Sequence, residues 1–249
     1  MLLFDGFDKV LADLPLFVEA FFKVSLVSAI FGMIIAIIIG VIFGLFAVGQ
    51  SKILRLLSRI FVELFQNTPI LILLFFLYAF SPYIFKDALD PIVIGTIVVG
   101  VYTSAYVCEI IRSGITSIPK GQFEAAASQG FSYIDTMRYI ILPQAFRLIL
   151  PSLTTQIVSV IKNTSILQCI TAPDLMYQAE IWTSYSGHSG PSYILAAIIY
   201  FICCYPLTMF SRHLEKKAAA GYKAKKEDVV ITEELVGEIK ETPKGGVTV

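Results

Sequence analysis

The sequence has few charged residues and no net charge. Asp, Glu, Lys and Arg make up 15% of its 249 residues, whereas 56% are hydrophobic. This composition excludes an ordinary water-soluble domain and predicts a membrane protein. Because the formal net charge is zero, no overall field attracts nucleic acid, and we expect no nucleic-acid partner.

Several chemical motifs are also missing. The four cysteines form no CxxC pair or zinc-ligand spacing, and they lie in or beside apolar runs as small hydrophobic residues. His188 and His213 fall in separate loops on opposite sides of the predicted membrane, so no metal site is expected. The sequence contains no G-x-x-x-x-G-K-[ST] loop for ATP phosphates and no Gly-x-Ser-x-Gly nucleophile motif. We therefore predict that the chain is not an enzyme and binds no cofactor itself.

Long apolar runs dominate what the sequence does contain. A hydrocarbon core about 30 Å thick needs roughly 20 apolar residues in a helix, and these runs are continuous where the strands of a membrane barrel would alternate. We predict an all-α integral membrane protein with five transmembrane helices. The predicted spans are Val24 to Val48, Ile60 to Phe80, Pro91 to Glu109, Ile140 to Thr171, and Tyr193 to Phe210.

Basic residues gather in every second segment that connects the predicted spans. They are Lys52, Arg55, Arg59, Arg112, Lys120, Arg138, Arg147, Arg212, Lys216 and Lys217. Since cytoplasmic loops carry the excess of Lys and Arg, these connections are predicted to be cytoplasmic, with the amino terminus outside and the carboxyl terminus inside. Residues 1–217 form the membrane domain. The polar stretch 218–249 is predicted to be a disordered cytoplasmic tail.

The connection between the third and fourth spans contains a short helix of small residues. Gln122 to Gln129 has strong helix formers and ends at Gly130, which suits a left-handed cap. Ser132, with Asp135 three positions later, predicts the start of the next helix. The small side chains allow a partner's backbone to approach closely, so Glu124, Ala125, Ala126 and Ala127 form a candidate docking surface. An amphipathic helix resting on the membrane surface is the alternative.

The order of these residues resembles a known signature. Glu124, Ala125 and Ala126, followed by Gly130, Ile140, Leu142 and Pro143, are similar to the EAA motif of permease subunits of bacterial ATP-binding-cassette (ABC) importers. The resemblance extends from Val18 to Lys217. Further runs resemble the polar amino-acid uptake branch, which includes histidine, glutamine, glutamate and arginine permeases: Gln66 to Pro69, Ser117 to Gln122, Leu142 to Arg147, and Lys162 to Ser165.

The resemblance implies a type I ABC importer-like fold in a bacterial inner membrane. It implies pairing with a second permease subunit, identical or related, and docking of the segment from Glu124 to Gly130 in a groove on one of two ATPase subunits, which would bind ATP and Mg. It also implies an extracytoplasmic amino-acid-binding protein that delivers the substrate to the outer loops, 83–90 and 173–191. Asn163 stands where many such permeases carry Asp, which argues against a cationic substrate.

Polar side chains share one side of the fourth span. They are Ser152, Thr155, Gln156, Ser159, Lys162 and Asn163. Lys162 lies about 22 Å along the helix axis from Arg147, where an unpaired charge costs at least about 2.5 kcal/mol. In one interpretation Lys162 extends outward to water or pairs with an acid of a partner subunit. In the other, a zwitterionic or acidic amino acid binds to Gln156, Ser159, Lys162, Asn163, Thr164 and Ser165.

A second polar group interrupts the second span. Gln66, Asn67 and Thr68 precede Pro69, which predicts a kink, and we prefer a kink that faces the pathway to a purely structural bend. Tyr106 in the third span is a further candidate for the pathway. Near it, Glu109 and Arg112 are predicted to neutralise each other rather than to form a gate. The spacing of Gly40 and Gly44 permits close helix contact.

The predicted mechanism follows from the absence of an ATP-binding loop. A ligand shifts a conformational equilibrium only by its differential affinity for the two states, so ATP on the partner ATPases must favour one separation of the docking helices. The paired permeases would then alternate between inward-facing and outward-facing forms. An amino-acid transporter or channel driven by an ion gradient is the alternative.

Overall fold

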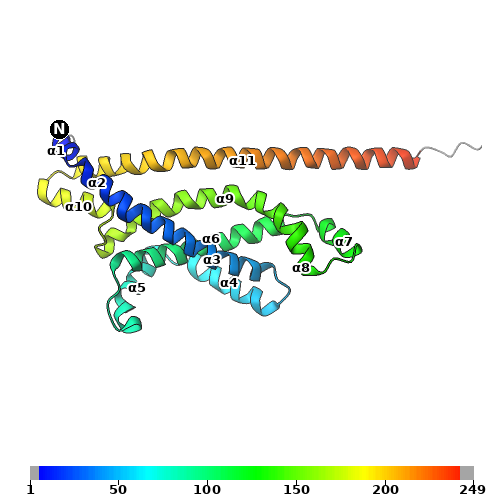
Figure 1. Ribbon diagram of the computed structural model, residues 1–249, viewed down its shortest axis with the longest axis horizontal. Coiled ribbons are helices and arrows are strands. Elements are labelled where there is room, and N and C mark those ends of the chain that lie inside the picture. The colour runs from blue at the N-terminus through cyan, green and yellow to red at the C-terminus, as the bar shows by residue number, and fades with distance from the viewer. Residues whose placement is uncertain (1–5, 242–249) are drawn as a thin grey trace, which may run out of the picture.

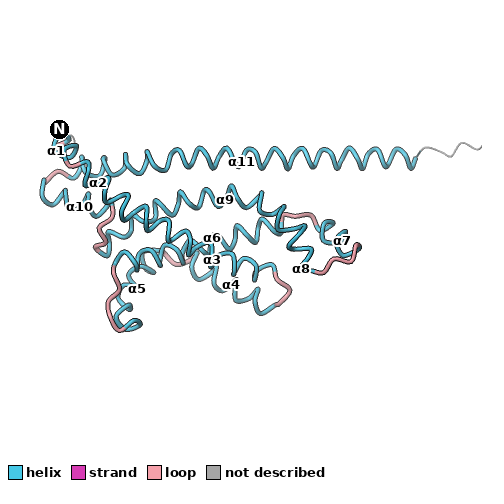
Figure 2. The backbone as a smooth tube through the Cα atoms, in the orientation of Figure 1, coloured by secondary structure: helices cyan, strands magenta, loops and turns pink. Residues whose placement is uncertain are grey.

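The computed structural model describes the backbone of residues 6–241 and the side chains of residues 6–217. All the secondary structure in these residues is helical (Figures 1 and 2). The elements are α1 (Phe7–Ala12), α2 (Leu14–Ala20), η1 (Phe21–Leu26), α3 (Val27–Val48), α4 (Lys52–Gln66), α5 (Ile70–Phe85), α6 (Pro91–Thr116), α7 (Lys120–Ser128), α8 (Tyr133–Asp135), η2 (Thr136–Ile141), α9 (Leu142–Asn163), η3 (Thr164–Ile170), α10 (Leu175–Ser186) and α11 (Ser189–Glu241). The elements η1 and η2 are π-helices, and η3 is a 3₁₀-helix.

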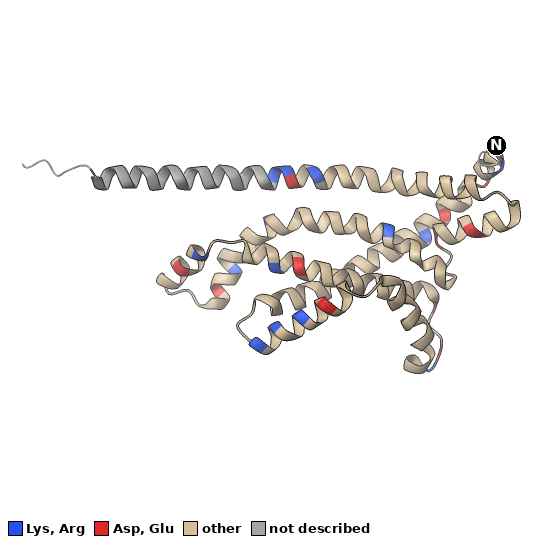
Figure 3. Ribbon diagram, turned by 180° about the vertical axis from the view of Figure 1, so that it is seen from behind, with Lys and Arg blue, Asp and Glu red and all other residues tan. Residues whose placement is uncertain are grey.

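The predicted membrane fold is confirmed. Within the described residues, four helical stretches are long and apolar enough to cross a membrane, or five if the bent pair α4 and α5 forms one span. The four are Leu14–Val48, Pro91–Thr116, Tyr133–Ile170 and Ser189–Lys217. Charged residues gather toward the two ends of the bundle, leaving a mostly uncharged band between them (Figure 3). Side chains such as Phe31 and Phe201 are 57% and 63% exposed, as expected of surfaces that face lipid.

The predicted break and bend in the second span are confirmed, and the bend is sharper than a kink within one helix. Helices α4 and α5 meet at 97°. Pro69 disfavours helical backbone at the residue before it. The side chains at the break also bond to carbonyls of the preceding turn: Asn67 Nδ2 donates to Glu63 O over 2.8 Å, and Thr68 Oγ1 donates to Leu64 O over 2.7 Å. The bond from Thr68 gives Leu64 O a partner in place of the backbone N–H that it would have in a continuous helix.

Close packing of α3 against α6 forms the centre of the bundle. A Cβ atom added at Gly40 would lie 2.6 Å from Cβ of Val107, and one added at Gly44 would lie 2.8 Å from Cβ of Ile111. The absence of side chains at these two positions therefore sets how closely the helices approach. The expected close contact is confirmed, and it lies within one chain.

Helix α10 occupies the segment that the sequence analysis assigned to an outer loop. Asp174 begins it, because Asp174 Oδ1 accepts a hydrogen bond from the backbone N–H of Tyr177 over 2.8 Å. Gly187, with φ of +73°, ends it. At the other end of the chain, α11 continues through residues 218–241. Ala, Lys and Glu, which are strong helix formers, are frequent in this stretch. Residues 242–249 of the predicted tail lie outside the described residues.

Candidate functional site

Helix α7 carries the predicted docking surface at one end of the bundle (Figure 1). Glu124, Ala125 and Ala127 are exposed, whereas Ala126 is 3% exposed and packs against its own chain. The small side chains therefore have two roles: Ala126 lets α7 lie close to the bundle, and its two neighbours leave a smooth outer surface. The exposed carboxylate of Glu124 is the charged group on this surface.

The end of α7 is fixed by a left-handed glycine. Gly130 has φ of +82°, which costs little without a Cβ atom. Its N–H donates to Ala127 O over 3.0 Å, and the N–H of Phe131 donates to Ala126 O over 3.1 Å. These two bonds form a Schellman motif, so the predicted cap at Gly130 is confirmed.

The next helix begins where the sequence predicts. Ser132 Oγ accepts a hydrogen bond from the N–H of Asp135 over 3.2 Å, and it donates to Asp135 Oδ2 over 2.5 Å. The chain then passes through η2 into α9. The extra residue that this π-helix inserts into the helix was not predicted, because no local sequence signal marks it.

A side-chain hydrogen bond ties α7 to α9. Gln144 Nε2 donates to Gln122 Oε1 over 3.3 Å and to Ile140 O over 2.8 Å. Gln144 lies in the first turn of α9, so the bond joins α7 to the base of that helix. Sequence analysis placed both glutamines in family-like runs but did not pair them, since they are 22 residues apart.

The polar stripe on α9 divides between two surroundings. Thr155 Oγ1 lies 2.7 Å from Ser211 Oγ, so Thr155 lies toward α11. The Lys162 side chain is exposed in the single chain. Thr164 is fully buried and donates to Ile161 O over 2.7 Å. Thr164 therefore lies in the packed interior rather than on an open surface.

The other predicted residues of this stripe are accessible. Gln156, Ser159, Asn163 and Ser165 are partly exposed. Ser159 Oγ donates to Thr155 O over 3.3 Å, which satisfies its hydrogen while leaving its lone pairs available. Asn163 is the last residue of α9, immediately before the helix narrows into η3.

A second set of polar side chains lies on and beside α6: Gln66, Tyr102 and Tyr106. Gln66 Nε2, at the end of α4, donates to Ala105 O over 3.3 Å and so reaches the turn that carries Tyr106. The hydroxyl of Tyr106 lies 2.9 Å from that of Tyr102, one turn away. Sequence analysis missed Tyr102, although its four-residue spacing from Tyr106 was the available signal.

Arg112 forms a two-pronged ion pair with Glu109. Its Nε and NH2 atoms lie 3.0 and 2.7 Å from the carboxylate oxygens of Glu109. The expected mutual neutralisation is confirmed. In the part of the chain with described side chains, no group of three His, Cys, Asp or Glu residues is placed to hold a metal ion.

The polar stripe of α9 and the polar side chains beside α6 lie at similar depths in the bundle. Gly95 contacts Leu167 of η3 and Gly114 contacts Ile149 of α9, which fixes the alignment of α6 with the antiparallel α9 and η3. At equal helical rise, this alignment places Tyr106 at the level of Gln156. No hydrogen bond between residues with described side chains joins the polar side chains of α9 to those beside α6.

A multi-span helical chain with polar side chains within its spans has the architecture of a membrane permease. Residues 32–220 match the family described as binding-protein-dependent transport system inner membrane component. The chain therefore belongs to that family. Its members confirm the predicted ABC importer permease over the alternative of a transporter driven by an ion gradient.

Individual relatives cover most of the chain. The probable glutamine ABC transporter permease protein GlnM of Bacillus subtilis is 34% identical over 89% of this chain and 98% of its own length. The probable glutamine ABC transporter permease protein GlnP of the same organism is 35% identical over 78% and 90%. Both are permease subunits of transporter complexes.

Solved structures share the fold. A chain from the crystal structure of an amino acid ABC transporter with histidines is 29% identical, with a TM-score of 0.78, over 85% of this chain and 98% of that one. A chain of the MetNI methionine ABC transporter in an inward facing conformation has a TM-score of 0.66 over 82% and 96%; at 20% identity, it supports the fold alone. The predicted type I importer fold is confirmed.

Proposed function

We propose that this chain is the translocating subunit of an amino-acid importer and that α7 receives the force of ATP binding. The observation that carries this proposal is the short exposed helix α7, capped at Gly130 and bonded to the base of α9. The relatives that cover most of the chain are named as glutamine or amino-acid permeases. The substrate class proposed for this chain is therefore a polar amino acid.

The proposed orientation follows from the charges. Basic residues of α4, α7 and η2 gather at the α7 end of the bundle, as Figure 3 shows. Because cytoplasmic segments carry the excess of Lys and Arg, this end faces the cytoplasm and the α1 and α10 end faces outward. The chain then meets its ATPases at α7 and an amino-acid-binding protein at the opposite end.

The energy comes from partner subunits, which bind ATP and Mg, because this sequence has no phosphate-binding loop. ATP favours one spacing of two paired permeases by binding more tightly to that state. The change in spacing passes from α7 through Gln122 and Gln144 into α9. The same helix carries the polar side chains proposed to line the pathway.

The pathway lies between the two permeases. Gln156, Ser159, Lys162, Asn163 and Ser165 supply its polar surface from α9 and η3. Gln66, Tyr102 and Tyr106 supply it from the α4 and α6 side, next to Asn67 and Thr68 at the break. Lys162 is exposed in the single chain but lies within a span, so pairing with a second permease, identical or related, would enclose it.

Reconstitution tests the docking role. The complete complex, with ATPases and binding protein, is placed in proteoliposomes, and uptake and ATP hydrolysis are measured together. Glu124→Lys should leave ATP hydrolysis running while reducing uptake about tenfold, because it reverses the charge on the docking surface. The matched control is Glu124→Asp, which keeps the negative charge on the docking surface and should change neither rate.

The glycine cap offers a second test. Gly130→Ala forces a Cβ atom into left-handed backbone and should uncouple the two rates, at a cost of about 1 kcal/mol in α7. Gly121→Ala is the control, because Gly121 lies in the same helix with open space around its missing Cβ atom. Tight coupling in both Glu124→Lys and Gly130→Ala would contradict the role of α7.

A further inference from the structure

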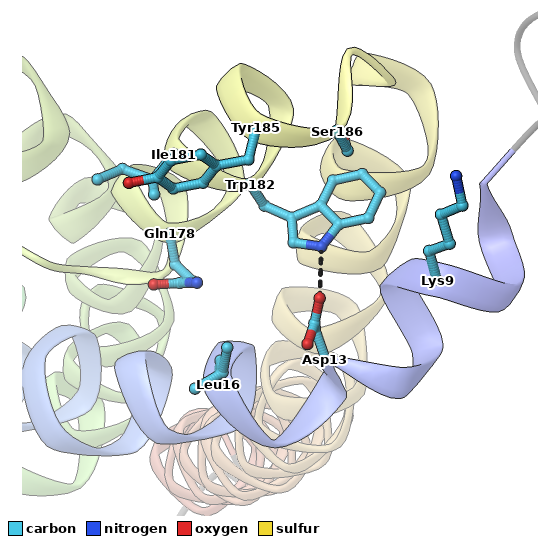
Figure 4. A pocket seen from close by; sticks show the side chains of 8 residues that line it. All are labelled: Lys9, Asp13, Leu16, Gln178, Ile181, Trp182, Tyr185 and Ser186. Carbon is cyan, nitrogen blue, oxygen red and sulfur yellow. Dashed lines mark hydrogen bonds between the residues drawn. The ribbon is translucent and has the colours of Figure 1, made fainter.

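A cavity of about 300 Å³ opens at the end of the bundle opposite α7. It lies between α1 and α2 on one side and α10 on the other (Figure 4). Its lining residues are Lys9, Asp13, Leu16, Gln178, Ile181, Trp182, Tyr185 and Ser186. The lining combines a cation, an anion and two aromatic rings with apolar side chains, and neither the docking surface nor the proposed pathway includes any of these groups.

The charged groups of the cavity are held in place without neutralising each other. Asp13 Oδ2 accepts a hydrogen bond from the indole N–H of Trp182 over 2.9 Å, which fixes the carboxylate at the cavity wall. Lys9 lies one helical turn before Asp13, since the N–H of Asp13 donates to Lys9 O over 3.3 Å. The ion pairs among residues with described side chains are Glu19 with Lys23 and Glu109 with Arg112, so neither Lys9 nor Asp13 belongs to one.

The cavity lies at the amino-terminal end of the stretch Leu14–Val48 that is able to span a bilayer, and Leu16 is the third residue of this stretch. Trp and Tyr are enriched where a membrane meets water, because each ring has an apolar body and a polar edge. Leu16 is 49% exposed and Tyr185 is 86% exposed, so the cavity opens toward the surroundings of the bundle.

We propose that this cavity binds the headgroup of a phospholipid with an ethanolamine headgroup. The phosphate lies against the Lys9 ammonium, and the lipid's ammonium, two carbons away, donates to the free oxygen of Asp13. The Cβ atoms of residues one helical turn apart lie about 6 Å from each other. The long, exposed side chain of Lys9 can turn toward the cavity, so the ammonium can meet the phosphate of a small zwitterion whose cation faces Asp13. The start of the acyl chain follows the exposed apolar surface at Leu16. The assignment does not depend on which substrate the permease carries.

The chemistry also predicts which lipids bind poorly. A choline headgroup carries no N–H to donate to Asp13. A glycerol headgroup has no cation at all, so it leaves the carboxylate facing an anionic lipid. A dissolved zwitterion such as an amino acid shares the charges of ethanolamine lipid but lacks the acyl chain, and the apolar lower wall favours the lipid.

Trp182 gives a direct measurement, because it is the sole tryptophan in the sequence. The full chain is placed in nanodiscs of mixed ethanolamine, choline and glycerol phospholipids. In each of three otherwise identical preparations, a different one of these lipids carries a dibromo acyl chain, which quenches tryptophan on contact. Quenching by the ethanolamine lipid should exceed that by either other lipid about twofold or more. Equal quenching by all three would overturn the proposal.

Two variants test the assigned contacts. Asp13→Asn retains an oxygen for the Trp182 indole while removing the charge, and Lys9→Gln removes the cation. Each should abolish the preference for ethanolamine lipid. Lys23→Gln is the control, because Lys23 is a cation at the same end of the bundle but lies outside the cavity. This variant should retain the preference for ethanolamine lipid. Circular dichroism checks that each variant keeps its helical content. An unchanged preference in both cavity variants would contradict the assignment.

Further additions distinguish other occupants. Glutamine or phosphoethanolamine added to the solution should leave the lipid preference intact. Loss of the preference in their presence would identify a dissolved zwitterion as the ligand and overturn the lipid assignment. Two results together would instead assign the cavity to the binding protein: Trp182 emission changes only when the purified binding protein is added, and no lipid preference is seen without it.

Discussion

Gln144 on α9 donates a hydrogen bond to Gln122 on α7 over 3.3 Å. The two residues join the helix proposed to contact the ATPase to the helix that carries Lys162. Both side chains are partly buried, and Gln144 also donates to Ile140 O, which fixes the direction of its amide group. The pair is therefore the shortest described polar connection between the docking surface and the polar side of α9.

Removing this connection should loosen the coupling. Gln144→Ala is expected to reduce uptake per ATP hydrolysed about fivefold, which corresponds to one neutral hydrogen bond of about 1 kcal/mol. Both rates are measured in proteoliposomes that contain the complete complex. Gln50→Ala serves as the control, because Gln50 is exposed between α3 and α4, outside α7 and α9, and its side chain makes no hydrogen bond to a residue with a described side chain. An unchanged ratio in Gln144→Ala would show that α7 moves α9 through other contacts.

The sequence predicted the features that depend on local chemistry. Gly130 was placed at a left-handed cap, and Ser132 with Asp135 at a helix start, because each motif involves residues within one turn. The apolar runs located the spans for the same reason. The boundaries of the runs differed from those of the helices, since the helix at Pro91 continues through polar residues to Thr116.

The features that were missed depend on residues distant in sequence. The contact between Gln122 and Gln144 requires the chain to reverse direction, and the hydrogen bond from Trp182 to Asp13 joins residues 169 positions apart. The sharp angle between α4 and α5 also depends on packing against α6, where Gln66 reaches Ala105. Periodicity and local motifs carry no information about such contacts.

A small substitution at the α3 and α6 contact should destabilise the bundle. Gly40→Ala places a Cβ atom 2.6 Å from Cβ of Val107 and 2.9 Å from the backbone oxygen of Ser104, so the helices must separate. We expect a loss of about 1–3 kcal/mol, typical of overpacking. The midpoint of thermal aggregation in mild detergent measures the effect.

Gly32→Ala is the matched control on the same helix. Its Cβ atom would lie 3.5 Å from Thr96 O, which is an ordinary contact. The midpoint temperature of Gly32→Ala should therefore be close to that of the unchanged protein. If Gly40→Ala had the same midpoint temperature, the close approach of α3 and α6 would not limit stability.

Replacement of Lys162 distinguishes its two interpretations. If Lys162 binds the carboxylate of an amino acid, Lys162→Met should raise the KM for uptake about tenfold, because a charge-assisted hydrogen bond is lost. Lys162→Arg should restore much of the affinity. Uptake assays with the assembled complex give both values.

The other interpretation predicts a different result. If Lys162 pairs with an acid of the second permease, Lys162→Met should reduce the yield of assembled complex, measured by size-exclusion chromatography, and leave the KM of the remaining complex unchanged. An unchanged KM and an unchanged yield together would indicate that the side chain extends to water.

Asp174 should make stability depend on pH. Its side chain is fully buried, and burial raises the pKa of its carboxyl from 3.8 to about 7, against the opposing effect of the backbone N–H groups of Tyr177 and Met176. Oδ2 is buried with no hydrogen-bond partner among residues with described side chains, which explains why the charged form is disfavoured. Because the folded state holds the proton more tightly than the unfolded state, stability is greatest below about pH 4 and falls as the pH rises to about 7.

Asp174→Asn should remove this dependence, since the amide keeps an oxygen for the N–H of Tyr177 and carries no charge. We expect the variant to be more stable than the unchanged protein at pH 8 by about 1 kcal/mol or more, and the difference to vanish near pH 4. Thermal melting across this pH range measures it. Asp90→Asn is the control: Asp90 also caps a helix, with Oδ1 2.7 Å from the N–H of Ile92, but it is exposed, so its replacement should give no gain at pH 8. Lower stability of Asp174→Asn at pH 8 would mean that the buried carboxylate has a cationic partner in the assembled transporter.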